Sequence, residues 1–215
     1  MDADIREELS ALLQEMGQDP ENTEGWLKLG GKLYDDGRLE DAVSAYQIAL
    51  ELDSCRADAW RELGATLFVL GQNEEAESAM KTGLEYDSDD ADSWYNLGCF
   101  YNANDRNEEA EIAFKAALEH RPEGPDIWCN LGVLYSTTGR PVEAEMALKK
   151  AIEIRPEHLV AWLNLVQLLH AESRSDEAEK AYDTAVEHVP GFESFVESLQ
   201  EYVDEKIDDE NNGSS

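Results

Sequence analysis

The sequence predicts an all-α fold, an α-solenoid of five helix-turn-helix repeats with a capping helix at each end. Three observations predict it: a tryptophan, a leucine and an alanine each recur every 34 residues, which is the spacing from Trp26 to Trp60. The tryptophans are Trp26, Trp60, Trp94, Trp128 and Trp162, the leucines follow three residues later, and the alanines follow sixteen residues later. No insertion breaks this register. A fixed interval of this length is typical of stacked supersecondary units.

The third repeat shows why each unit should consist of two helices. Apolar or small residues stand at i, i+3, i+4 and i+7 in its first half, and a similar spacing returns in its second half. These residues are Trp94, Leu97, Gly98 and Tyr101, then Ala110, Ala113, Phe114 and Ala117. The spacing fits one face of an α-helix and not the alternation of a strand. Asn107 is the expected N-cap of the second helix, and Pro141 stands near the start of the equivalent helix in the next repeat.

A glycine follows the leucine in four repeats and is replaced by Val166 in the fifth. We expect Gly98 to lie opposite Ala110, so that the two helices of the hairpin approach closely. The large side chain that follows the alanine should fill space toward the neighbouring repeat. Val166 therefore predicts a more open fifth hairpin. In the turns, Asp105 and Ser173 stand where three other repeats have glycine.

The pattern Trp-x2-Leu-Gly, then Ala, Phe, Ala and Pro within one repeat, resembles the tetratricopeptide repeat (TPR) family. The resemblance covers residues 23–192. It divides them into the predicted repeats 23–56, 57–90, 91–124, 125–158 and 159–192. Because this fold serves many different partners, the resemblance implies an architecture, a right-handed solenoid, and does not identify one ligand.

Segments on both sides of the repeats should complete the fold. Residues 1–22 are predicted to form an N-terminal capping helix, a degenerate half-repeat, and residues 193–207 a C-terminal capping helix. Solenoid ends need such covers because a terminal repeat otherwise exposes its apolar face. The alternative for the second segment is that it occupies the groove of the array or docks on a partner. Residues 208–215 are predicted to be a disordered acidic tail.

The charge of the chain excludes several classes of partner. The 215 residues include 49 acidic and 17 basic side chains, a net charge of −32. Binding to nucleic acid needs clustered basic residues, so nucleic acid is not an expected partner. Anionic membrane surfaces are disfavoured for the same reason. The acidity either steers basic partners or is a solubility adaptation to high salt, which would fit the presence of only eight lysines.

The sequence predicts a cytoplasmic protein without membrane insertion. Its start has no basic and apolar leader, and no apolar run approaches the ~18 residues of a membrane-spanning helix. Three scattered cysteines do not form a disulfide framework. Cys99 and Cys129 could face a common groove as a redox or metal pair, but without Cys-x-x-Cys spacing free thiols are the favoured interpretation.

No arrangement of residues predicts catalysis. The four histidines are dispersed, and the metalloprotease, phosphate-loop and nucleophile-elbow motifs are missing. We therefore predict no enzymatic activity, no catalytic residue, no metal site and no cofactor.

The TPR resemblance implies that the first helices of the repeats line a concave groove. Asparagine recurs there as Asn96, Asn130 and Asn164, an arrangement that resembles the asparagine ladder of the TPR domain in O-linked N-acetylglucosamine transferase. A primary amide offers both a donor and an acceptor, so such a ladder can bind the backbone of an extended peptide. The alternative is that each asparagine bonds to a neighbouring helix and only supports the stack.

A row of acids precedes the tryptophans, namely Glu24, Asp58, Asp92 and Asp126. Each acid stabilises a helix N-terminus by ~0.3–1 kcal/mol without any ligand. Alternatively, the row anchors lysine or arginine side chains of a partner. The remaining candidates for peptide binding are Tyr95, Asn102, Arg61, Lys28 and Gln167. Because only Lys28 and Arg61 are basic, the groove does not match the Lys/Arg clamp of TPR domains that bind acidic chaperone tails.

These features predict a non-enzymatic adaptor that binds a neutral-to-basic segment of a partner protein, extended or helical, in the concave groove. One alternative is a substrate-recruiting subunit of an enzyme assembly whose catalytic chain is separate. Another is a structural or weakly self-associating module of a halophilic organism.

Overall fold

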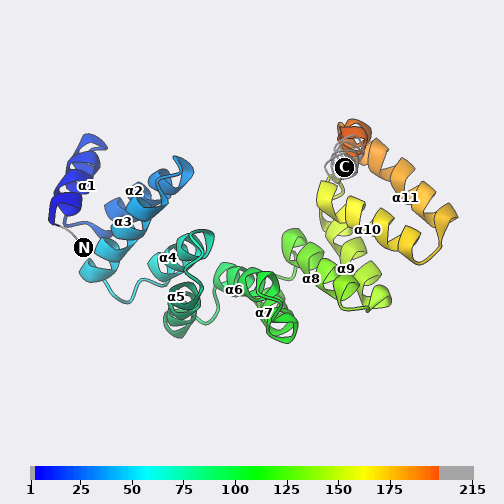
Figure 1. The fold of residues 1–215 in the computed structure, drawn as a ribbon, viewed down its shortest axis with the longest axis horizontal. Coiled ribbons are helices and arrows are strands. Elements are labelled where there is room, and N and C mark those ends of the chain that lie inside the picture. The colour runs from blue at the N-terminus through cyan, green and yellow to red at the C-terminus, as the bar shows by residue number, and fades with distance from the viewer. Residues whose placement is uncertain (1–2, 199–215) are drawn as a thin grey trace, which may run out of the picture. The chain divides into compact units, whose positions relative to one another are not determined.

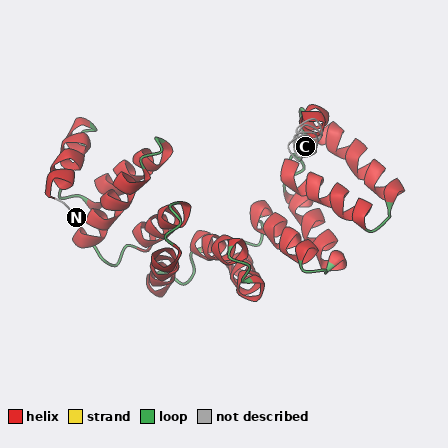
Figure 2. Ribbon diagram, in the orientation of Figure 1, coloured by secondary structure: helices red, strands yellow, loops and turns green. Residues whose placement is uncertain are grey.

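The computed structural model describes residues 3–198, and this part of the chain is built from α-helices and turns without strands (Figures 1 and 2). The first helices of the hairpins are α2 (Thr23–Asp35), α4 (Ala57–Val69), α6 (Ala91–Ala103), α8 (Pro125–Thr137) and α10 (Leu159–Ala171). The second helices are α3 (Leu39–Leu52), α5 (Asn73–Tyr86), α7 (Asn107–His120), α9 (Pro141–Ile154) and α11 (Ser175–His188). Helix starts recur at the same interval as the tryptophans, and the predicted all-α helical solenoid is confirmed.

The chain divides into two compact units, residues 1–122 and 123–215. The first unit holds α1 (Ala3–Glu15) and three hairpins, and the second holds the hairpins α8–α9 and α10–α11. The division falls close to the predicted limit between the third and fourth repeats.

Within the first unit, each second helix contacts both its own partner and the next first helix. Thus α3 packs on α2 and α4, and α5 packs on α4 and α6. The first helices also contact one another, α2 with α4 and α4 with α6. Helix α1 packs against α2 and α3 and buries Leu9 and Leu13. In the second unit α8, α9 and α10 contact one another in the same way.

Glycine in each of four first helices sets the distance between the two helices of a hairpin. A Cβ atom at Gly98 would lie only 2.6 Å from the ring of Phe114. The large side chain one turn after Ala110 thus covers Gly98 within its own hairpin, and at the equivalent Gly64 the carbonyl oxygen of Ala76 also lies 3.2 Å from such a Cβ. The expectation that this side chain also fills space toward the next repeat stays a prediction. Side chains on a helix lean toward its N-terminus, so Phe114 reaches back over Gly98.

The same contact recurs in the other hairpins that have the glycine. A Cβ would lie 2.4 Å from Tyr46 at Gly30, 2.6 Å from Met80 at Gly64 and 2.7 Å from Leu148 at Gly132. In the fifth hairpin Val166 occupies this position, and Tyr182 is only half-buried. The ring of Tyr182 packs instead on Phe192, with 5.5 Å between centroids. Valine thus prevents the close packing of the other hairpins.

One residue in the turn of every hairpin has a positive φ angle. Asp105 and Ser173 adopt φ angles of 57° and 59°, in the left-handed region that Gly37, Gly71 and Gly139 occupy elsewhere. Pro141 lies in the first turn of α9.

The predicted N-cap at Asn107 is wrong, because α7 begins at Asn107 and Arg106 holds the cap position. The Arg106 side chain makes no cap bond and pairs with Glu77 and Glu109 instead.

The C-terminal predictions lie largely outside the described residues. Of the predicted capping helix 193–207, only the part up to residue 198 is described and it is helical. Phe192, just before it, is buried. The predicted tail 208–215 lies wholly outside. Among residues 3–198, none of the helices combines the length and apolar character that crossing a bilayer requires.

Candidate functional site

Tryptophan fixes α2, α4, α6 and α10 to the turns before them. The Trp26 indole N–H donates to the carbonyl oxygen of Pro20 at 2.7 Å. The same bond, always to the residue six positions earlier, joins Trp60 to Ser54, Trp94 to Ser88 and Trp162 to Pro156 at 2.7–2.9 Å. The recurrence of Trp with Pro or Ser at this spacing was visible in the sequence, but the bond between them was not predicted. These tryptophans therefore have a structural role.

Two predicted asparagines of the first unit present unused amides. Asn96 and Asn102 lie on α6 and are partly exposed. Neither side-chain amide has a hydrogen-bond partner within residues 3–198. Their donors and acceptors are therefore available to a ligand. Tyr95, on the same helix, packs its ring 6.2 Å from that of Phe114.

In the second unit the predicted asparagines are already engaged. The amide of Asn164 donates to the carbonyl oxygen of Val160 at 2.8 Å, one turn earlier on α10. Asn130 on α8 is partly buried and also interacts with other residues of the chain. Gln167 on α10 is exposed. The three asparagines therefore differ in environment although they repeat in sequence.

The row of first-turn acids is paired with arginines of this chain. Arg56 makes a bidentate contact with Asp58 at 2.6 and 2.9 Å and reaches Glu24 at 3.3 Å. The hydrogen bonds from Arg56 hold the pKa of Asp58 below its ordinary value. Arg121 bonds to Asp92 at 2.6 Å.

Asp126, in the second unit, meets two basic side chains. Both terminal nitrogens of Arg155 lie 3.2 Å from its carboxylate oxygens. The buried His158 ring places Nε2 3.1 Å from Asp126, while its Nδ1 accepts a hydrogen bond from the backbone N–H of Ala161. This geometry fits the neutral tautomer with its proton on Nε2. Glu24, Asp92 and Asp126 thus tie their hairpins to the closing turns, whereas Asp58 pairs with Arg56 just before its own helix.

The two predicted basic residues also serve the fold. Arg61 joins α4 to the cap of α6 through a 2.8 Å bond to Asp90, and it also contacts Glu62 at 3.0 Å. Lys28 is exposed and lies 3.7 Å from Glu24.

A second set of ion pairs, between second helices, was missed by sequence reasoning. Arg106 pairs with Glu77 of the preceding hairpin and Glu109 of its own helix, and Arg174 pairs in the same way with Glu145 and Glu177. The sequence signal consists of three residues: an arginine just before the second helix of a hairpin, a glutamate in the first turn of that helix, and a glutamate in the second helix of the previous hairpin. In the second repeat Gln72 replaces the arginine, and Val43 stands where the glutamate would be.

The cysteines differ in accessibility. Cys55 is exposed, Cys99 intermediate and Cys129 buried. Burial, together with the nearby Asp126 carboxylate, raises the pKa of the Cys129 thiol to about 11. Within residues 3–198 no cluster of three or more His, Cys, Asp or Glu side chains has the geometry of a metal site.

Comparisons with known proteins agree with this architecture. The family described as cilia and flagella-associated protein 70 C-terminal domain matches residues 6–201. No curated protein sequence matches the chain. Among solved structures, the fold is similar to that of a MamA protein, with a TM-score of 0.67, 25% identity, and coverage of 77% of this chain and 91% of that one.

Two further structures have the same fold at lower identity. PilF of Pseudomonas aeruginosa has a TM-score of 0.73 and 24% identity, covering 77% of this chain and 76% of that one. YrrB, described as a TPR protein with an unusual peptide-binding site, has a TM-score of 0.64 and 21% identity, covering 89% and 97%. The predicted TPR relationship is confirmed. The chain belongs to the family of cilia and flagella-associated protein 70 C-terminal domains, a TPR family whose repeats form a protein–protein interaction scaffold.

Proposed function

We propose that this chain is a non-enzymatic adaptor that binds a neutral-to-basic segment of a partner protein on the exposed faces of its first helices. The proposal rests on the environment of the Asn96 side chain. It is partly exposed on α6 and its amide has no hydrogen-bond partner among the described residues. An amide can donate to a peptide carbonyl and accept from a peptide N–H, so it can bind backbone of any sequence.

Neighbouring polar groups extend this surface in each unit. In the first unit Asn102 lies six residues after Asn96, on the same helix. In the second unit Gln167 is exposed, and Asn164 uses one amide N–H for Val160. Because a primary amide has a second N–H and an acceptor oxygen, Asn164 keeps the capacity to bind a peptide as well. YrrB, which shares the fold, is described as having a peptide-binding site.

The charge of the chain favours a segment that is not acidic. The net charge of −32 raises the local concentration of basic ligands and repels acidic ones. Asp58, Asp92 and Asp126 are paired with arginines, so they add to this field without each being a free anchor. We expect them to affect the association rate and its salt dependence more than the affinity.

The proposal is tested by affinity capture from a source lysate, read by mass spectrometry. Wild type is compared with Asn96→Ala, with the triple variant Asn96→Ala, Asn130→Ala, Asn164→Ala, and with the control Asn107→Ala on α7. A partner captured by wild type and Asn107→Ala should be lost with the triple variant and reduced with Asn96→Ala. Circular dichroism must show equal helicity in all four proteins.

A peptide with the sequence of the captured partner's binding segment is then synthesised and titrated into the protein by calorimetry. We expect this segment to be neutral or basic and to bind more weakly as salt rises. Equal binding to wild type and to the triple variant would overturn the assignment to this face. An enzyme among the captured chains would favour the substrate-recruiting alternative over a simple adaptor.

A further inference from the structure

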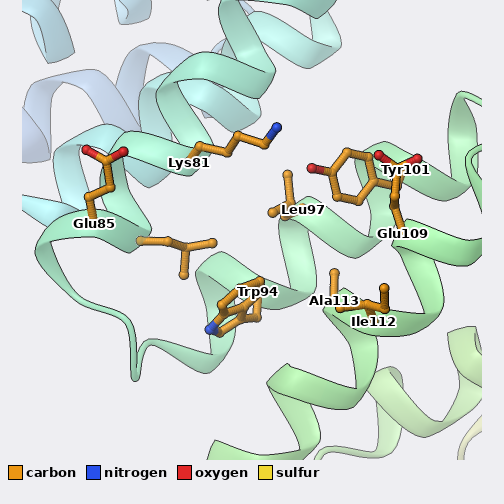
Figure 3. A pocket seen from close by; sticks show the side chains of 9 residues that line it. Lys81, Glu85, Trp94, Leu97, Tyr101, Glu109, Ile112 and Ala113 are labelled. Atoms are coloured by element: carbon orange, nitrogen blue, oxygen red, sulfur yellow. The ribbon is translucent and has the colours of Figure 1, made fainter.

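A hollow of about 420 Å³ lies in the first unit, between the second helices α5 and α7. We call it the outer hollow. Figure 3 shows α5 and α7 on its two sides, with Trp94 and Leu97 of α6 between them. Its lining residues are Lys81, Leu84, Glu85, Trp94, Leu97, Tyr101, Glu109, Ile112 and Ala113. A hollow of this size lies within the ~300–1,000 Å³ of small-ligand pockets.

The interior of the outer hollow is apolar. Leu97 is 3% exposed at its base, whereas Ile112 is 66% exposed on the wall formed by α7. An isoleucine with this exposure gains free energy when a partner covers it. The hollow is therefore shaped for one large apolar side chain rather than for a charged group.

The rim of the outer hollow is acidic once internal ion pairs are taken into account. Lys81 is bonded to Glu77 at 2.7 Å, and Glu109 is bonded to Arg106. Glu85 has no ion pair among residues 3–198. The helices α5 and α7 together carry eight carboxylates and two lysines. The field at this rim therefore attracts cations.

We propose that the outer hollow is a second docking site, which binds an aromatic or large aliphatic side chain flanked by lysine or arginine on a partner protein. The apolar interior provides the anchor site and the acidic rim selects the flanking charges. A second copy of this chain is a poor occupant, because two chains of net charge −32 repel each other. None of the asparagines on the first helices lines the outer hollow, so this proposal does not depend on the proposed function.

The second unit provides an internal comparison. A hollow of about 280 Å³ there is lined by residues two repeats later in the chain, including Trp162 in place of Trp94. The position of Ile112 is taken by Lys180. This lysine removes an apolar contact and adds a positive charge to the hollow, so a basic segment should prefer the first unit.

The test uses the peptide acetyl-Lys-Lys-Phe-Lys-Lys-amide and the full chain labelled with ¹⁵N. The indole N–H signals of the five tryptophans are followed by nuclear magnetic resonance and assigned with single Trp→Phe variants. We expect saturable shifts of the Trp94 signal and smaller changes at Trp162. Replacing phenylalanine by serine, or every lysine by glutamate, in the peptide should abolish the Trp94 shift.

Variants of the protein separate the anchor from general charge attraction. Ile112→Lys introduces the residue that the second unit already has, and it should weaken binding at least tenfold. Val142→Lys is the control, because Val142 is 69% exposed on α9 and does not line either hollow. Glu85→Gln should weaken binding about two- to fivefold, the equivalent of one exposed ion pair. Asn96→Ala should bind as wild type does, even if the proposed function fails.

Three results would overturn the proposal. One is the absence of a saturable Trp94 shift. Another is an equal loss of binding in Ile112→Lys and Val142→Lys, which would indicate charge attraction without an anchor site. The third is equal binding of the serine-substituted peptide, which would show that the apolar interior is not used.

Discussion

Arg106 at the start of α7 donates a hydrogen bond from each terminal nitrogen to the carboxylate of Glu77 on α5, at 2.6 and 3.1 Å. In the second unit Arg174 and Glu145 repeat this contact between α11 and α9, at 2.5 and 3.3 Å. Bidentate pairs of this kind are the strong class of charged hydrogen bond. They fasten adjacent hairpins within each unit, and they make the stability of the protein depend on pH.

Stability should fall in acid because these glutamates are ionised in the folded state. The Arg106 hydrogen bonds lower the pKa of Glu77 from 4.5 to about 2, and Arg174 does the same for Glu145. Because the folded-state pKa lies below the unfolded one, the stabilisation is complete above about pH 4.5 and is lost as the pH falls to about 2. Urea unfolding between pH 7 and pH 2 measures the change.

Matched variants isolate this contribution from the charge of the whole chain. Glu77→Gln should cost about 1–2 kcal/mol at pH 7 after allowance for solvent screening. Its deficit should shrink toward pH 2. Glu85→Gln, on the same helix but without an ion pair among the described residues, should not lower stability. A deficit of Glu77→Gln that stays constant with pH would contradict this explanation.

The melting temperature should rise with salt. At net charge −32 the folded chain repels itself, and screening relieves this repulsion. The screening length falls from about 30 Å at 0.01 M to about 8 Å at 0.15 M ionic strength. Calorimetry over this range and up to 1 M NaCl provides the measurement. A melting temperature that does not rise would exclude the halophile alternative.

Adding a methyl group at Gly98 should destabilise the third hairpin. The new Cβ would lie 2.6 Å from the buried ring of Phe114, so Gly98→Ala should cost about 1–3 kcal/mol. Gly31→Ala is the control, since its Cβ would meet nothing closer than 3.9 Å. There alanine should stabilise the helix by about 0.5–1 kcal/mol. The two variants should shift the urea midpoint in opposite directions from that of wild type. Equal losses of stability in both would contradict the packing argument.

Glycine at two turn positions should stabilise the protein. Ser173 and Asp105 adopt left-handed backbone angles that strain most L-residues. Ser173→Gly should raise stability by about 0.5–1 kcal/mol, and Asp105→Gly by less, because aspartate tolerates this region better than serine does. The reciprocal change Gly37→Ser should be destabilising, although nothing lies within 4 Å of the added Cβ. Thermal melts of the three variants would show the order.

The thiols should react at different rates. Cys55 is exposed, while Cys129 is 2% exposed with a pKa raised to about 11. An aromatic disulfide reagent at pH 8 should modify Cys55 first and Cys129 only after the addition of denaturant. Cys55→Ser should remove the fast phase. Rapid labelling of Cys129 in the folded protein would show that its helix opens readily.

Repeat length, helix positions, turn positions and net charge could be predicted from the sequence because each depends on local spacing or on composition. The fixed interval between tryptophans places every hairpin, and the turn positions could be read from glycine in three repeats although aspartate and serine stand there in the other two. The N-cap of α7 was predicted wrongly, because the helix already includes Asn107 and Arg106 takes the cap position. A guanidinium has no acceptor for a helix N–H, and Arg106 pairs instead with Glu77 of the preceding hairpin and with Glu109.

Only the tertiary structure decided which charged groups meet. The sequence presented Asp92 as a possible anchor for a ligand, but Arg121, from the far end of the same hairpin, already binds it. It presented three equivalent asparagines, whereas Asn164 bonds to its own helix and Asn96 does not. Periodicity tells which face of a helix a residue occupies. It does not tell which atoms of another hairpin lie within hydrogen-bonding distance of that face, since the packing of helices determines those distances.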